Sequence, residues 1–495
     1  MKSTLFLGLA LLSGALFAVE LDVSADRNAT QLDVPLRKIG CLKPRAAAEI
    51  EDNNWTLCSE LHGKGMPFYN GAKRFMGPLG LKKVRVSLQW FRIEREKGVF
   101  DFSEFDKVVD YAISQGVRPW LGVGSGNRKV WPGSGDEFSV GGSMPTTEEG
   151  FAAFEMFVRK TVEHYAAKGV KDWVCWNEPD TCKSNTVEQI VRVSRITLRE
   201  IRRVDPTARV AGLTLATSSP ILWEKCFKAL GDDAAKYNQF VYHGYCWNPD
   251  GSYFDVEVLK SLCRKYAPQA KMWQGENGAP SEFTAAGALA DKAPWSEVSQ
   301  AKYNLRRMLG DLGHDVESAL FMLTDWGPNP GGKGLLRSSG TETIAIKKSY
   351  YAVQNLTSDF DNTLTRNEKA QFIDSDKWMA RYEYGKADGR AVLVFWDHGD
   401  IECMRQKTKG AGPDAWWRKW PTLRPTESFQ TRPTAFVWQN GRPLSEPVWI
   451  DLMTGWVYEF PKEHMIDLGK KGVLFTNVPL YDSPCLLTER SVVLP

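Results

Sequence analysis

Two glutamates end apolar runs at positions where packing does not explain a carboxylate. The run that begins at Asp172 ends in Trp-Asn-Glu-Pro, and the run that begins at Lys271 ends in Gln-Gly-Glu-Asn. Burying a carboxylate costs desolvation free energy, so Glu178 and Glu276 are expected to face a cavity. Hydrolysis of an acetal needs a carboxylic acid on one side of the reacting carbon and a carboxylate on the other. The two residues are therefore predicted to form a catalytic pair.

The spacing of the apolar runs predicts the elements that carry this pair. Eight runs begin at positions 37, 84, 117, 172, 208, 240, 271 and 319, and stretches of helical period separate them. A mean step of roughly 40 residues suits one strand and one crossover helix. Eight such units predict a (β/α)8 TIM barrel over residues 37–358, with residues 37–42 as its first strand. An open doubly wound sheet would alternate in the same way, but no Gly-x-Gly-x-x-Gly follows the first run.

The barrel prediction explains how residues far apart in the chain meet. Parallel barrel strands all end at one face, and active sites of this fold lie there. The fourth and seventh strands stand on opposite sides of an eight-stranded ring, so Glu178 and Glu276 are expected to converge across its mouth.

The pattern of apolar and polar residues changes near residue 359. Short alternating strands with turn signals follow, which predicts an antiparallel β-sandwich domain over residues 359–495. Residues 19–36 are a candidate for an added strand of that sandwich. Residues 404–433 are basic and rich in proline and tryptophan; they are read either as a surface excursion with its tryptophans packed beneath it or as a flap that lines a sugar groove.

Composition excludes several classes of function. The chain has 495 residues, with 63 Lys and Arg against 60 Asp and Glu, so its net charge of +3 gives no field that attracts nucleic acid. Six histidines leave few ligands for a metal centre, and no metal or cofactor is predicted. The 19 tryptophans favour a carbohydrate substrate, because the flat face of Trp stacks on sugar C–H surfaces.

The N-terminal residues resemble a secretory signal peptide. Met1 and Lys2 precede an apolar stretch that is too short to span a bilayer, and small residues follow up to Ala18. Residues 1–18 are predicted to be removed, with cleavage after Ala18 or Ala15, which leaves a secreted or periplasmic protein without a membrane anchor. Nine cysteines without a Cys-x-x-Cys pair permit disulfides but do not define them, and the sequence does not set the oligomeric state.

Three segments carry a resemblance to a known family. Trp-Asn-Glu-Pro at the end of the fourth run, with a second Glu at the end of the seventh, resembles the retaining glycoside hydrolases of clan A, which share a (β/α)8 barrel. Within that clan, VEHYAAKGVKDWVCWNEPD looks like glycoside hydrolase family 39, the β-xylosidase and α-iduronidase family. The segment VRVSLQWFRIEREKGVFDFSEFDKVVDYAISQGVRPW is similar to families 5, 39 and 42. In MWQGENGAP, Gly275 stands where family 39 commonly has Thr.

The resemblance implies a role for each matched residue. Glu178 would be the general acid/base and Glu276 the nucleophile. From the residues alone, a Glu276 beside a guanidinium and a phenol stays an anion, whereas a Glu178 in an aromatic wall keeps its proton. The pair is expected about 5–5.5 Å apart, the spacing that retains anomeric configuration. The remaining implied contacts are Asn177 with the sugar 2-hydroxyl, Arg85 and Tyr245 with the nucleophile, His243 beside the acid/base and Trp326 as an aromatic platform.

Each of these residues also has a structural interpretation. Arg85 could instead form a structural ion pair in the barrel, and His243 could be a core histidine. Trp326 could simply pack at the barrel rim. For Trp176 and Trp273 packing is the favoured interpretation. Further candidates for contact with sugar are Trp90, Asn127, Trp131 and Trp247.

The leading interpretation of the sequence is an exported retaining glycoside hydrolase that acts on an oligo- or polysaccharide. Three alternatives are a glycan-binding barrel without catalysis, a transglycosylase that uses the same residues, and a metal-dependent barrel hydrolase.

Overall fold

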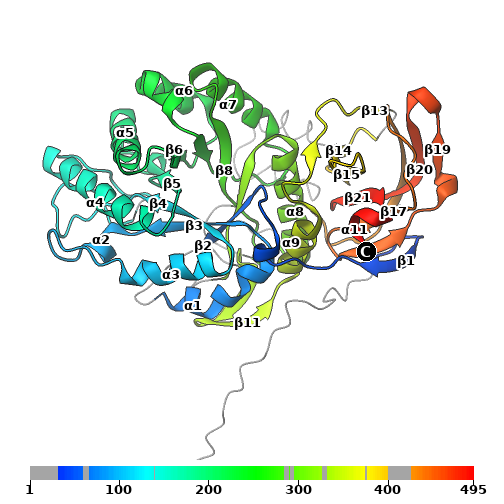
Figure 1. Ribbon diagram of the computed structural model, residues 1–495, viewed down its shortest axis with the longest axis horizontal. Coiled ribbons are helices and arrows are strands. Elements are labelled where there is room, and N and C mark those ends of the chain that lie inside the picture. The colour runs from blue at the N-terminus through cyan, green and yellow to red at the C-terminus, as the bar shows by residue number, and fades with distance from the viewer. Residues whose placement is uncertain are drawn as a thin grey trace, which may run out of the picture.

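The computed structural model describes residues 32–59, 66–138, 140–283, 289, 295–325, 332–373, 376–399 and 425–494. These residues form a closed parallel barrel beside a body of antiparallel sheets (Figure 1). The predicted fold class, a (β/α)8 barrel with an additional C-terminal β-sandwich, is confirmed.

The barrel consists of eight parallel strands in chain order, and it closes where its last strand pairs with its first. The strands are β2 (Trp55–Ser59), β3 (Lys83–Leu88), β4 (Arg118–Val123), β5 (Asp172–Cys175), β6 (Arg209–Leu215), β7 (Gln239–Tyr242), β8 (Lys271–Asn277) and β9 (Glu317–Leu320). The described helices are α1 (Pro67–Ala72), α2 (Trp90–Ile93), α3 (Ser103–Ser114), α4 (Glu148–Ala166), α5 (Val187–Val204), α6 (Pro220–Leu230), α7 (Tyr253–Tyr266), α8 (Glu297–Gly313), α9 (Lys348–Asp359) and α11 (Arg490–Val493).

Helix α4 illustrates how the sequence forms the outer layer. The side chain of Thr147 caps the helix by accepting a hydrogen bond from the Gly150 amide at 3.0 Å. Phe151, Phe154 and Val158 recur at helical spacing and are buried against the barrel. None of the helices in the described part of the chain combines the length and the apolar character that crossing a bilayer requires.

The barrel interior is a packed core below the mouth. Residues from alternate positions of the strands meet there, among them Cys58, Trp120, Val174 and Trp273. The rings of Trp120 and Trp273 lie 4.8 Å apart between centroids. Trp273 is fully buried, so the packing interpretation holds for it.

The predicted first barrel strand, residues 37–42, is wrong. Residues 37–41 form β1 (Arg37–Cys41), which pairs antiparallel with β18 (Trp456–Glu459) at an edge of the sandwich, where β1 is drawn blue among orange and red strands (Figure 1). The residues of β1 are exposed or half-buried, as an edge strand allows, whereas every residue of β2 is buried. A parallel strand covered on both faces needs the second pattern.

The second body contains two antiparallel sheets. One has the order β1-β18-β17-β21-β15-β14-β12 and the other β13-β16-β20-β19, and a hairpin of β10 and β11 lies between β9 and α9. The strands not yet given are β10 (Leu336–Ser339), β11 (Glu342–Ile346), β12 (Thr365–Arg366), β13 (Phe372–Ile373), β14 (Met379–Gly385), β15 (Ala391–Asp397), β16 (Arg432–Trp438), β17 (Pro447–Asp451), β19 (Met465–Asp467), β20 (Val473–Leu480) and β21 (Cys485–Glu489).

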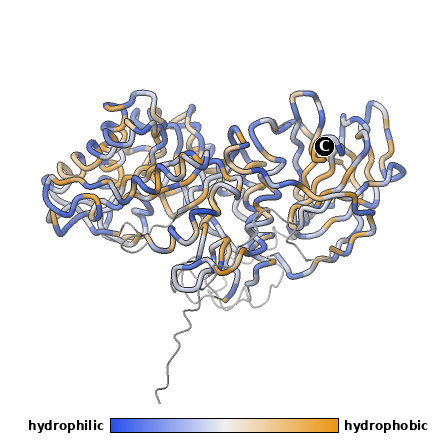
Figure 2. Tube along the Cα trace, turned by 60° about the horizontal axis from the view of Figure 1, so that its bottom comes forward, coloured by the Kyte–Doolittle hydropathy of each residue, from blue (hydrophilic) through white to orange (hydrophobic). Residues whose placement is uncertain are grey.

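Apolar segments alternate with hydrophilic loops in both bodies (Figure 2). The core of the sandwich includes Phe395, Phe436, Trp449 and Phe475 from the two sheets. Residues 1–31, which include the predicted signal peptide, and residues 404–424 of the Trp-rich segment lie outside the described residues.

Buried charges join the sandwich to the barrel. Asp250, in the segment after β7, accepts hydrogen bonds from the Arg306 guanidinium of α8 at 2.8 Å and from the Trp396 indole of β15 at 2.9 Å. Lys302 of α8 pairs with Asp482 of the sandwich at 2.6 Å. The sandwich thus supports the segment that follows the sixth barrel strand.

Candidate active site

Glu178 lies on a strained turn directly after β5. Trp176 and Glu178 have φ angles of 53° and 45°, a left-handed conformation that residues other than glycine rarely adopt. Such residues cost of order 1–3 kcal/mol each and cluster at functional sites. Gly124 at the end of β4 makes room for this turn, since a Cβ there would lie 2.2 Å from the Trp176 Cα. The Glu178 amide donates a hydrogen bond to the Thr214 carbonyl at 2.9 Å, which holds the turn over β6.

Glu276 lies in an irregular part of β8. The pairing of β8 with β9 shifts register between Gln274 and Asn277. The Gln274 carboxamide donates hydrogen bonds to the backbone carbonyls of His243 and Glu276 and accepts one from Asn277 at 2.7 Å. Irregularities of this kind re-aim side chains next to active sites. Sequence reasoning missed the role of Gln274, although an amide inside an apolar strand was a visible signal.

Gly275 has a steric reason to differ from the Thr that is common in family 39. A Cβ at Gly275 would lie 2.3 Å from Val241 and 3.3 Å from the His243 Nε2 atom. The Val241 side chain therefore occupies the space that a Cβ at position 275 would need, and the imidazole lies close behind it.

Two neighbours hold the two carboxylate oxygens of Glu276. The Arg85 guanidinium donates to Oε1, and the Tyr245 hydroxyl donates to Oε2 at 3.3 Å. His243 Nδ1 lies 3.6 Å from Oε2. Burial by itself raises the pKa of Glu276, but the positive charges of His243 and Arg85 outweigh burial, and the pKa lies below its usual value. Glu276 is thus an anion at neutral pH.

Glu178 has a different environment. Its Oε1 atom lies 2.5 Å from Nδ1 of the fully buried His243, whose Nε2 lies 3.4 Å from Arg85 Nη1. Each of Glu178, His243 and Glu276 offers an atom to a common point, and these atoms lie within 4.8 Å of one another. Carboxyl groups of retaining glycosidases lie about 5–5.5 Å apart and those of inverting enzymes about 6.5–9.5 Å. The 4.8 Å bound applies to one oxygen of each carboxyl group, so the retaining spacing stays a prediction.

The structure thus brings together Arg85, Glu178, His243, Tyr245 and Glu276. Asn177 is half-buried beside Glu178, and its carboxamide oxygen has no hydrogen-bond partner among the described residues. Trp326 lies outside the described residues, so its predicted platform role stays a prediction.

Three further sugar-contact candidates belong to a buried cluster around Glu94. The indoles of Trp90 and Trp131 donate to the Glu94 carboxylate at 2.6 and 3.0 Å, and the Asn127 carboxamide donates to the Glu94 carbonyl at 2.7 Å. All three are buried. Their contacts are therefore structural.

Trp247 lies closer to the site. It is half-buried, its ring stacks on Trp295 at 6.0 Å, and it packs with Tyr245 on the same apolar cluster. It is the one of the four candidates that is not buried.

Lys333, in the segment after β9, is a residue that sequence reasoning missed. Its side chain is buried and its ammonium lies 4.1 Å from the centroid of the Tyr245 ring. Burial lowers the pKa of Lys333 to about 8, against the opposing pull of the Glu276 and Glu178 charges. The available signal was a lysine enclosed by glycines, Gly-Gly-Lys-Gly, shortly after the eighth apolar run.

The same three side chains offer the donor set of a metal site. Glu178, His243 and Glu276 supply two carboxylates and an imidazole, which suit a divalent cation. However, Arg85 occupies an oxygen of Glu276, and Lys333 adds a second positive charge nearby. These cations oppose a bound metal ion, so the surroundings favour chemistry that uses protons and a carboxylate.

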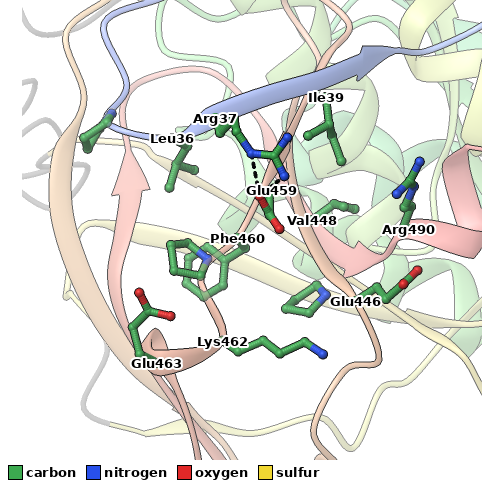
Figure 3. A pocket seen from close by; sticks show the side chains of 13 residues that line it. Leu36, Arg37, Ile39, Glu446, Val448, Glu459, Phe460, Lys462, Glu463 and Arg490 are labelled. Carbon is green, nitrogen blue, oxygen red and sulfur yellow. Dashed lines mark hydrogen bonds and ion pairs between the residues drawn. The ribbon is translucent and has the colours of Figure 1, made fainter.

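A separate pocket lies on the sandwich. It has a volume of about 590 Å³, lies between β1, β17 and β18, and its lining includes neither Glu178 nor Glu276. Figure 3 shows the ion pair of Arg37 with Glu459 in this pocket. Both side chains are largely exposed, so the pair is weak and marks no catalytic centre.

Comparisons with known proteins support the architecture. No protein-family model matches the sequence, and no curated protein matches it significantly. A family 39 glycoside hydrolase from Bacteroides cellulosilyticus superposes with a TM-score of 0.59 at 16% identity, over 88% of this chain and 80% of the other. A monomeric β-xylosidase from Caulobacter crescentus gives 0.55 at 14% identity, over 91% and 97%. A family 30 subfamily 8 xylanase from Clostridium acetobutylicum gives 0.54 at 11%, over 90% and 97%.

Proposed function

We propose that this protein is an exported retaining glycoside hydrolase that cleaves O-glycosidic bonds of an oligo- or polysaccharide. One observation carries the proposal. Glu178 and Glu276 come from opposite strands, offer atoms within 4.8 Å of each other, and differ in their surroundings. The fold shared with glycoside hydrolases supports the same conclusion.

The first chemical step uses the two carboxyl groups in opposite senses. Glu276 attacks the anomeric carbon and forms a glycosyl ester, while Glu178 gives its proton to the departing oxygen. Arg85 and Tyr245 hold Glu276 ionised and oriented for this attack.

The second step reverses these roles. Glu178, now a carboxylate, takes a proton from water, and the water oxygen attacks the anomeric carbon and releases Glu276. His243, 2.5 Å from Glu178, orients this group in both steps. Asn177 hydrogen-bonds the sugar 2-hydroxyl, an interaction that strengthens in the transition state.

A panel of nitrophenyl glycosides tests the proposal. Xylosides belong in it, since two of the structural neighbours are a xylosidase and a xylanase. Proton NMR of the first product formed should detect the anomer of the substrate. The opposite anomer would contradict the assignment of Glu276 as nucleophile, and binding without turnover would favour the glycan-binding alternative.

A chelator separates the proposal from a metal-dependent hydrolase. Turnover should be the same with and without EDTA, because the proposed steps use protons and a carboxylate only. Activity lost with EDTA and regained with zinc would assign Glu178, His243 and Glu276 as metal ligands.

Export is proposed from the first 18 residues alone. Expression of the full chain in a bacterial host should place the protein in the periplasm or medium, with a new N-terminus at Val19 or Leu16. Retention of Met1 in a cytoplasmic product would contradict it.

A further inference from the structure

Lys333 stands apart from the other charged groups of the site. Its side chain is 2% exposed, and among the described residues it makes no ion pair or side-chain hydrogen bond. Its ammonium faces the ring of Tyr245 at 4.1 Å and that of Phe321 at 6.0 Å. A lysine buried in this way costs desolvation free energy that two aromatic rings only partly offset.

The backbone around Lys333 is held rigidly. The Gln300 carboxamide donates to the carbonyls of Gly332 at 3.0 Å and of Lys333 and Gly334 at 3.2 Å. The Gly334 amide donates to Asp325 at 2.9 Å. These contacts tie the backbone of residues 332–334 to α8 and to Asp325, so the lysine is part of a built site.

Glu276 does not account for the lysine. Its Oε1 atom accepts from Arg85 and its Oε2 atom from Tyr245. Lys333 forms no ion pair with it, and Asp325 is already paired with Lys347 at 2.8 Å. Glu178, the other carboxylate whose charge acts on Lys333, lies 2.5 Å from His243 Nδ1, so these described carboxylates already have other partners.

The two cations of the mouth are therefore partnered unequally. Arg85 is paired with Glu276, whereas Lys333 makes no ion pair with a carboxylate of the described residues and faces aromatic rings. A buried cation without an ion-pair partner is matched when an anion enters.

We propose that Lys333 recognises an anionic substituent, a carboxylate or a sulfate ester, on the sugar that binds beside Glu276. The substrates would then be acidic glycans such as uronic acid polymers or sulfated polysaccharides. This inference rests on the proposed glycosidase function and extends it to the class of substrate.

Matched aryl glycosides test the inference. The panel pairs nitrophenyl β-D-glucuronide with the β-D-glucoside and the glucoside 6-sulfate, and repeats the set in the galacto series and with α-anomers. The wild-type protein should prefer one anionic form over its neutral partner by about 10²-fold in kcat/KM, the scale of a lost buried charge contact. The preferred form tells carboxylate from sulfate.

Variants of Lys333 assign the preference to this residue. Lys333→Met should lower kcat/KM for the preferred anionic glycoside by about 10²-fold and for the neutral glycoside by less than about threefold. Lys333→Arg should keep part of the preference, because it keeps the charge. Lys369→Met, which removes an exposed lysine of the sandwich, serves as the matched control and should change neither value.

Two further measurements distinguish a substrate-binding role of Lys333 from a purely structural one. Lys333→Met should unfold at the same or a higher temperature, because it removes a buried charge without a protein partner. On the anionic substrate, wild-type kcat/KM should fall as pH rises through about 8, when the ammonium that faces Tyr245, Glu276 and Glu178 loses its proton. The ratio of kcat/KM on the anionic substrate to that on the neutral one should fall over the same range, which separates this loss from deprotonation of the general acid.

The possible failures are distinguishable. Turnover of neutral and anionic glycosides at equal rates, or an unchanged preference in Lys333→Met, would overturn the inference and leave the glycosidase function standing. Lower thermal stability of Lys333→Met with an equal loss on both substrates would make the lysine structural. No turnover of any glycoside would overturn the proposed function itself.

Discussion

The mouth of the barrel and the joint between barrel and sandwich both bury several charges, but they treat them differently. At the joint, Asp250 is satisfied by Arg306 and by the Trp396 indole, and Lys302 is paired with Asp482. At the mouth, Lys333 has aromatic neighbours and Glu178 has His243. Arg85 and Glu276 pair at the mouth as well, so the difference rests on Lys333, the cation that we propose meets a charge of the substrate.

The largest effect should come from the nucleophile. Glu276→Ala should lower turnover by about 10⁴-fold or more, because no covalent intermediate forms. Azide should restore activity and, with a β-glycoside, yield the α-glycosyl azide, which chromatography and NMR identify. Glu368→Ala, at an exposed glutamate of the sandwich, is the control. Turnover of Glu276→Ala near the wild-type rate would contradict a catalytic site at the mouth of the barrel.

The acid/base variant should show a loss that depends on the leaving group. Glu178→Ala should lose about 10²–10⁴-fold on substrates whose leaving group needs a proton. It should form the glycosyl-enzyme at nearly the wild-type rate from dinitrophenyl glycosides, which need none. Stopped-flow release of the dinitrophenolate measures this step. An equal loss on both kinds of substrate would assign Glu178 another role.

A charge of the joint should act on stability and not on chemistry. Asp250→Ala leaves the Arg306 guanidinium buried without its partner and should lower the free energy of unfolding by about 3–5 kcal/mol. Denaturant titration measures the loss, and Asp232→Ala, at an exposed position, should stay within about 0.5 kcal/mol. An Asp250→Ala variant that keeps its stability but loses its activity would mean that this charge of the joint serves the chemistry and not the fold.

The smallest effect concerns pH. Because the pKa of Glu276 lies below its ordinary value of 4.5, the acid limb of the wild-type kcat/KM profile should lie at a pH below that value. Arg85→Gln removes one cation, so burial raises the pKa of Glu276 and the acid limb should move to higher pH. A pH profile of kcat/KM measures the shift. An acid limb that stays in place would mean that Arg85 does not set the ionisation of Glu276.

The sequence predicts the barrel because each buried parallel strand is a nearly continuous apolar run, and it predicts Glu178 and Glu276 because they interrupt such runs. The same logic misplaces β1, since a short edge strand of a sandwich has similar residue types and differs in exposure. Gln274 and Lys333 escape prediction for another reason. Their importance comes from contacts with residues distant in the chain, which neither periodicity nor spacing encodes.

The docking of the segment after β7 on the sandwich limits how this protein can be divided. Asn248 donates to the His398 carbonyl at 3.2 Å, three residues beyond the Tyr245 that contacts Glu276. A barrel cut off after Asp359 would lose that support and expose the Asp250 carboxylate. A functional chimera, in evolution or in the laboratory, would therefore have to inherit the barrel and the sandwich surfaces of the joint together.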